Sequence, residues 1–135
     1  MKRHLLSFAV GLVLSGTVAH AHHSISGAYI TAREIHVEGT VREFHFVNPH
    51  PFLVVDVRNA NGIAKAWKFE MDNRSELSDA GMKMDTFKSG DRVVVSGNPA
   101  TTENEKLYIR KLDRPSDGFR YEQVGSSPKI TSRAR

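Results

Sequence analysis

Residues 34–46 read EIHVEGTVREFHF, and this stretch decides which fold the rest of the chain can adopt. Apolar and polar residues alternate as far as Val41, a period of two that is typical of a β-strand. Beyond Val41 the apolar positions change parity to Phe44 and Phe46, so one face stays buried only if the strand bulges or coils near residues 39–43. The sequence therefore predicts a long, bent first strand.

Four further strands and one short helix are expected after this strand. The strands are predicted at residues 52–58, 63–71, 92–97 and 106–113. Between the third and the fourth, cap-type residues at Asn73 and Ser75 and a stop at Gly81 favour one or two helical turns over residues 73–80. The order of three strands, a helix and two strands matches the five-stranded OB barrel, an all-β fold with a small helical contribution. A small open sandwich is the alternative.

The same alternation predicts which side chains fill the barrel. They are Val37, Val41, Phe44, Phe46, Leu53, Val55, Trp67, Phe69, Val93, Val95, Leu107 and Ile109.

The amino terminus has the three parts of a secretory signal peptide. Lys2 and Arg3 form a basic start, residues 5–14 form a short apolar run, and Ala19 and Ala21 are small residues at the end. The apolar run is about half the roughly twenty residues that a membrane-spanning helix needs. We therefore expect a cleaved signal peptide at residues 1–21 and a periplasmic or secreted protein with no transmembrane anchor after cleavage. Cleavage after Ala19 is the alternative.

The rest of the chain divides into a lead-in segment at residues 22–33, a barrel domain at 34–114 and a tail at 115–135. The tail is basic and rich in Pro, Ser and Gly, a composition that favours disorder. The formal net charge of +4 falls to +2 when the signal peptide is removed, which argues against nucleic acid as a partner. The chain has no cysteine, which excludes disulfides and thiolate ligands.

Four pieces of sequence together resemble an uncharacterised family of small exported bacterial proteins, a domain of unknown function. They are His22-His23-Ser24, residues 38–41 (EGTV), 47–50 (VNPH) and 88–97 (KSGDRVVVSG). The resemblance implies a signal peptide, a mature His-His-Ser start, an Asn-Pro-His turn and an OB-like barrel. The family has no established activity, so the resemblance leaves the chemistry open.

The first candidate site is the mature amino terminus. After cleavage at Ala21, the α-amine and imidazole of His22 can chelate a divalent ion, since both lose their protons near neutral pH. His23 and His50 are the candidate further ligands, and Pro49 and Pro51 hold His50 on a rigid turn. An all-nitrogen set favours Cu(II), with Zn(II) as the competing ion. The alternative for His50 is a turn histidine that is hydrogen-bonded to a neighbouring carbonyl.

Two weaker sets of metal ligands are also present. On a regular strand His36 and Glu38 share one face, as do Glu43 and His45, although such pairs also occur on ordinary solvated strands. Met82 and Met84 could favour Cu(I) through their thioethers, or at least one of them could fill a gap in the core.

The sequence thus predicts a small exported binding module whose favoured ligand is a divalent metal, copper first and zinc second. The alternative is a periplasmic adaptor that binds an envelope protein and has no metal site. There is no catalytic motif such as Gly-x-Ser-x-Gly or His-Glu-x-x-His, so enzyme activity is not expected. The sequence leaves the oligomeric state open.

Overall fold

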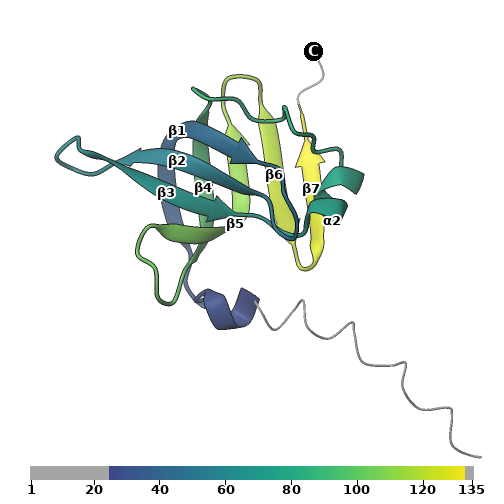
Figure 1. The fold of residues 1–135 in the computed structure, drawn as a ribbon, viewed down its shortest axis with the longest axis horizontal. Coiled ribbons are helices and arrows are strands. Elements are labelled where there is room, and N and C mark those ends of the chain that lie inside the picture. Colours follow the sequence, from purple (N-terminus) through teal and green to yellow (C-terminus); the bar gives the residue numbers. More distant parts are fainter. Residues whose placement is uncertain (1–24, 133–135) are drawn as a thin grey trace, which may run out of the picture.

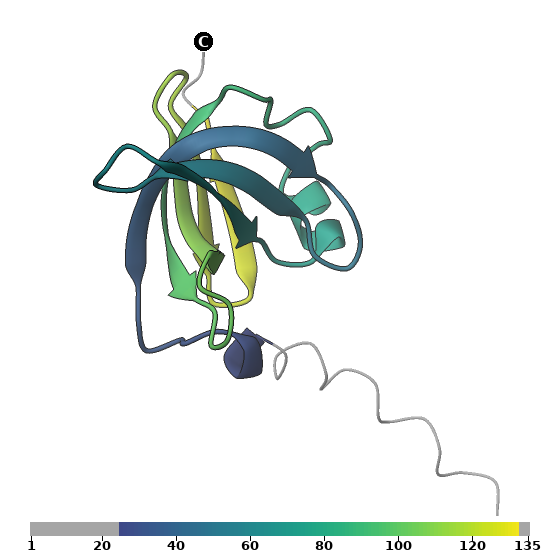
Figure 2. The same ribbon diagram turned by 60° about the vertical axis from the view of Figure 1, so that its left-hand side comes forward.

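The first strand, β1 (Ile35–His45), serves both halves of one sheet in the computed structural model, which describes residues 25–132. Its first half pairs antiparallel with β4 (Arg92–Pro99), and its second half pairs antiparallel with β2 (Phe52–Arg58). The register with β2 shifts between Val41 and Glu43. Figure 2 shows the resulting curvature of β1. The predicted long, bent first strand with a bulge at this place is confirmed.

The remaining strands close the sheet into a barrel (Figure 1). β3 (Ala64–Glu70) pairs with β2, and β5 (Lys106–Arg114) pairs with β4. A short parallel pairing between β3 and β5, from Lys68 with Lys106 to Glu70 with Tyr108, joins the two ends. The barrel order is therefore β3-β2-β1-β4-β5 with β5 returning to β3. This is the OB barrel that the sequence predicts, and closure excludes the open sandwich.

The helix α2 (Arg74–Asp79) follows β3 and begins at the predicted cap. The side chain of Asn73 accepts a hydrogen bond of 2.9 Å from the backbone N–H of Glu76, which satisfies one of the free donors of the first turn. Gly81, with φ of 100°, comes just after the end of the helix and adopts the left-handed conformation that glycine tolerates. The cap thus sets where the chain leaves β3.

The barrel interior contains the predicted side chains. Eight of them are buried, and Val37, Phe44, Phe46 and Trp67 are partly buried against the same core. Leu77 of α2, together with Met82 and Phe87 from the following loop, adds to the core. Contacts between apolar side chains from all five barrel strands therefore stabilise the closed form.

The predicted disordered tail at residues 115–135 is wrong for most of its length. β6 (Phe119–Val124) pairs with β5, and β7 (Ser127–Thr131) pairs with β6, so the sheet continues beyond the barrel. Alternate side chains of β6 face inward, and Phe119, Tyr121 and Gln123 are 7, 0 and 6% exposed. The barrel strands end at Arg114, and the folded domain extends beyond them through β7.

The turn before β6 shows why charge was a poor guide to this segment. The Arg114 guanidinium forms ion pairs of 2.8 Å with Asp91 and with Asp117, and it lies over the rings of Phe87 and Phe119. Arg114 immediately precedes the predicted basic tail, and its side chain is half-buried between the carboxylates of Asp91 and Asp117. Its charge is thus part of the fold.

The predicted signal peptide at residues 1–21, together with His22 and His23, lies outside the described residues. Within residues 25–132, no helix is long and apolar enough to cross a membrane.

Candidate functional site

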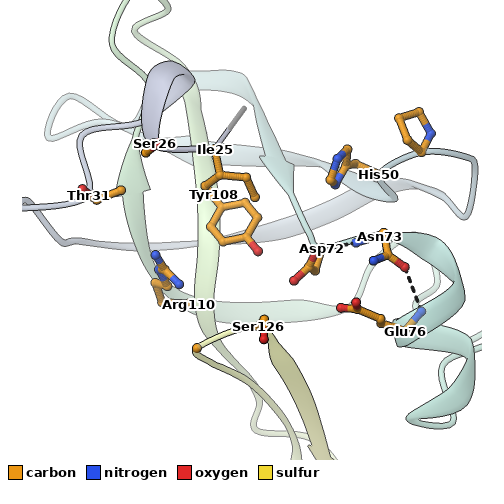
Figure 3. Close-up of a pocket in the computed structure, with 12 residues that line it drawn as sticks. Ile25, Ser26, Thr31, His50, Asp72, Asn73, Glu76, Tyr108, Arg110 and Ser126 are labelled. Atoms are coloured by element: carbon orange, nitrogen blue, oxygen red, sulfur yellow. Dashed lines mark hydrogen bonds between the residues drawn. The ribbon is translucent and has the colours of Figure 1, made fainter. Parts of the chain in front are cut away.

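A cavity of about 340 Å³ lies at one end of the barrel (Figure 3). Five parts of the chain line it: the segment at residues 25–31, the loop between β1 and β2, the start of α2 with the residue before its cap, strand β5, and the turn between β6 and β7. Its polar side chains include His50, Asp72, Glu76, Tyr108 and Arg110. Concave sites with a few converging polar groups are where small ligands bind most often.

The segment that precedes β1 is anchored at this cavity. The hydroxyl of Tyr29 donates a hydrogen bond of 2.5 Å to Glu70 Oε2, and its ring packs against Tyr108 with ring centroids 5.6 Å apart. Burial and then the Glu70 contact raise the pKa of Tyr29 well above its usual range, so the hydroxyl remains a proton donor. Backbone bonds of 2.9 Å, from Ile30 N to the Pro99 carbonyl and from Thr101 N to the Ala28 carbonyl, flank this contact. Ile25, a few residues upstream, lines the cavity.

His50 reaches the cavity from the loop between β1 and β2 and is half-buried. Its Nδ1 lies 3.1 Å from the carbonyl oxygen of Met71. Because a carbonyl oxygen only accepts, Nδ1 carries the proton and donates, and the lone pair is on Nε2. Within the described part of the chain, no group hydrogen-bonds Nε2. The expectation of a histidine bonded to a carbonyl holds, and the same bond orients the other nitrogen.

Asp72 is the carboxylate at the end of β3, and the carboxy-terminal hairpin positions it. Its Oδ2 accepts a hydrogen bond of 2.6 Å from Gln123 Nε2, and its Oδ1 accepts one of 2.7 Å from the backbone N–H of Asn73. The hydroxyl of Tyr121 donates to Gln123 Oε1 at 2.6 Å, which orients that amide. Both oxygens of Asp72 are thus satisfied within the protein.

Glu76 in α2 also faces the cavity (Figure 3), and one of its oxygens has no donor. Oε2 is buried, and no partner for it exists among residues 25–132. An unmatched buried acceptor is costly, and each such group in a native structure needs an explanation.

Arg110 lies across the cavity on β5. Its Nε donates a hydrogen bond of 2.7 Å to Asn98 Oδ1, and its guanidinium carbon lies 5.2 Å from the centroid of the Tyr108 ring. Asn98 is 3% exposed, and its Nδ2 donates to the Arg33 carbonyl at 2.8 Å. The buried amide therefore sets the orientation of the guanidinium. Burial, followed by the charge of Asp72, raises the pKa of Tyr108, so its hydroxyl remains protonated.

The weaker candidate ligands do not join His50. Glu38 Oε1 accepts a hydrogen bond of 2.7 Å from Arg92 Nε. His36, which lies on β1 with Glu38, is exposed. His45 Nε2 lies 2.6 Å from Glu43 Oε2, while its ring stacks on Phe52 with centroids 4.4 Å apart. Over residues 25–132, no three His, Cys, Asp or Glu side chains gather as a metal-binding group.

The two methionines do not converge either. Met82 is 1% exposed and belongs to the core, whereas Met84 is 75% exposed. The alternative in which a methionine fills a gap beside the helix is confirmed for Met82.

Sequence reasoning missed Asp72, Glu76, Tyr108 and Arg110. The only local signal was the position of Tyr108 and Arg110 two residues apart on one predicted strand. Asp72 and Glu76 lie on either side of the Asn73 cap, and the sequence pattern of this segment predicts only the start of a helix.

Comparison with known proteins identifies the family. Residues 10–107 match a family of unknown function, DUF6152. The chain belongs to this family. The resemblance to an uncharacterised family is thus confirmed, and DUF6152 membership assigns no activity to the cavity. No curated protein matches the chain.

Two solved structures resemble this DUF6152 protein. One is the mitochondrial single-stranded DNA binding protein Rim1 of S. cerevisiae, with 13% sequence identity and a TM-score of 0.46, covering 60% of this chain and 91% of that one. The other is the N-terminal domain of the PriB protein from Thermoanaerobacter tencongensis, with 14% identity and a TM-score of 0.39, covering 77% and 99%. At this level of similarity neither structure carries an argument about this chain.

Proposed function

We propose that this protein is an exported binding module that holds a divalent metal ion between its mature amino terminus and His50. The ligands are the α-amine and imidazole of His22, the imidazole of His23 and Nε2 of His50. Cu(II) is the favoured ion and Zn(II) the second.

The observation that carries this proposal is that Ile25 and His50 line the same cavity. His22 precedes Ile25 by three residues, and an extended chain spans at most about 3.5 Å per residue. The α-amine of a chain that begins at His22 therefore has a reach of about 10 Å from Ile25. The contacts of Tyr29 with Glu70 and Tyr108 hold the segment that contains Ile25 at the edge of the cavity.

The hydrogen bond of His50 supports the same proposal. Metal-binding histidines usually donate their second ring N–H to a carbonyl or carboxylate, which fixes the tautomer and aims the ligating nitrogen. His50 has this arrangement through Met71. Terminal amine, imidazole and a third nitrogen form a set that suits Cu(II), which also leads the affinity order of first-row divalent ions.

The test is titration of Cu(II), and separately of Zn(II), into mature protein that begins at His22. Intact mass of the exported protein first establishes that start. We expect one metal per chain and at least tenfold weaker binding for His50→Ala. His36→Ala is the matched control, since His36 is exposed on a strand outside the cavity, and it should bind as the unaltered protein does. Equal affinity for His50→Ala and the control would overturn the role of His50, and absence of binding would favour the adaptor.

A further inference from the structure

The cavity contains two groups of opposite charge, Arg110 and Glu76, that form no ion pair within residues 25–132. No carboxylate lies within ion-pairing distance of Arg110 among residues 25–132, although its guanidinium is held in place by Asn98. Glu76 has a buried Oε2 without any donor over the same residues. Asp72 differs from both, because Gln123 and the Asn73 N–H satisfy it.

Arg110 has the geometry of a carboxylate receptor. Asn98 occupies Nε, and the guanidinium carbon lies 5.2 Å from the ring centroid of Tyr108. The two terminal nitrogens have no ion-pair partner in the described chain, and this pair of donors matches the two oxygens of a carboxylate. Asn98 is itself held by the Arg33 carbonyl, so little freedom is lost when an anion binds.

Glu76 requires a ligand group of the opposite kind, a positively charged hydrogen-bond donor. A buried carboxylate oxygen requires an N–H or O–H donor, and a charged ammonium group satisfies it best. A simple anion bound at Arg110 would leave the Glu76 oxygen without a hydrogen-bond donor. A simple amine bound at Glu76 would leave Arg110 without an anionic partner.

We propose that the cavity binds a free α-amino acid, with its carboxylate on Arg110 and its ammonium group on Glu76. The volume of about 340 Å³ lies at the small end of the range for ligand pockets. Ile25, Pro49 and Tyr108 supply apolar lining for the side chain of the ligand. This inference goes beyond the proposed metal site and needs no metal.

The test uses the mature protein after treatment with a chelator, so that the metal site is empty of any ion. Each common L-amino acid is titrated separately and followed by chemical-shift changes in the amide spectrum. We expect at least one to bind, with its largest changes near Arg110, Glu76 and Ser126. That amino acid is then compared with the amine that lacks its carboxylate and with the acid that lacks its amine, and each should bind at least tenfold more weakly.

Substitutions of Arg110 and Glu76 test the same two contacts by changing the protein instead of the ligand. Arg110→Gln and Glu76→Gln, which preserve approximate size, should each weaken binding of the amino acid at least tenfold. Arg92→Gln is the control, since Arg92 pairs with Glu38 away from the cavity. If a variant fails to fold, the comparison of the three ligands decides alone.

Two results would overturn the proposal: no common amino acid binds, or the acid without the amine binds as tightly as its parent. Failure of this proposal and failure of the metal site are distinguishable. His50→Ala should lose metal but keep the amino acid, whereas Arg110→Gln should lose the amino acid but keep the metal.

Discussion

Gln123 on β6 donates a hydrogen bond of 2.6 Å to Asp72 at the end of β3. This bond joins the carboxy-terminal hairpin to the cavity, and the Tyr121 hydroxyl completes it by donating to the same amide. The hairpin is therefore a structural part of the site as well as an extension of the sheet.

Removing that amide should destabilise the protein. Gln123→Ala leaves the buried Tyr121 hydroxyl and Asp72 Oδ2 without their partner, and we expect the free energy of unfolding to fall by about 1–3 kcal/mol. Urea unfolding measures the change. Val124→Thr is the control on the same strand, because Val124 is 52% exposed, and it should stay within about 0.5 kcal/mol. Equal stability of the two variants would contradict the proposed connection.

Gly97 should not tolerate a side chain. A Cβ at this position would collide with the backbone of Tyr108 and lie 2.8 Å from Leu107 Cδ1, because β4 and β5 change register beside it. We expect Gly97→Ala to cost about 1–3 kcal/mol or more, as other overpacked sites do. Gly27→Ala is the matched control, since nothing lies within 4 Å of its Cβ position. Similar thermal unfolding of both variants would show that the two strands are not this close.

The protein should lose stability in acid partly through Asp117. Hydrogen bonds from Arg114 hold the pKa of Asp117 below its ordinary value, whereas in the unfolded chain it returns to about 3.9. The unfolded state therefore binds more protons in acid, so this contribution is present above about pH 4 and is lost as the pH falls through the folded pKa. Asp117→Asn should flatten the dependence of the unfolding free energy on pH in this range.

Ser116→Ala is the control for that experiment, because Ser116 is an exposed residue of the same turn. Its pH dependence should match that of the unaltered protein. An unchanged slope for Asp117→Asn would contradict the role of the Arg114 ion pair.

Trypsin should spare the carboxy-terminal hairpin of the native protein. Arg120 and Lys129 lie in paired strands, whereas Lys83 and Lys88 lie in the exposed part of the loop between α2 and β4. Cleavage of native protein requires local opening, so we expect the first cuts in that loop. Early cleavage after Arg120 would contradict the paired hairpin and support the disordered tail that the composition predicts. Digestion in denaturant shows that both sites are cleavable.

The barrel could be predicted because its signals are local. Pro51 and the turn at residues 59–62 bracket β2, whose predicted and observed bounds agree, and the Asn73 cap marks the start of α2. The sequence pattern does not predict the C-terminal hairpin, because one of its buried side chains, Gln123, is polar. The alternation on β6 is therefore not one of apolar and polar residues. The burial of Gln123 depends on a hydrogen bond to Asp72, fifty-one residues away in the chain.

The cavity could not be predicted from the sequence either, because residues that are far apart in the chain form it. Asp72 and Arg110 come together only when β3 pairs with β5 and closes the barrel. The register of such a non-local pairing depends on the whole core, and no short window of sequence contains it. His50 could be predicted because two prolines mark its turn, which is again a local signal.

The most direct test of the proposed metal site changes only where the mature chain begins. Mature protein beginning at His22 and a variant with three alanines added before His22 are titrated with Cu(II) side by side. A single added residue would place His23 third in the chain, where the amine, two backbone amides and the imidazole together bind Cu(II) strongly. The addition moves the α-amine away from the His22 imidazole and breaks their chelate, so we expect at least tenfold weaker binding with a changed visible spectrum. Equal affinity and an unchanged spectrum would contradict the terminal chelate, on which the proposed function depends.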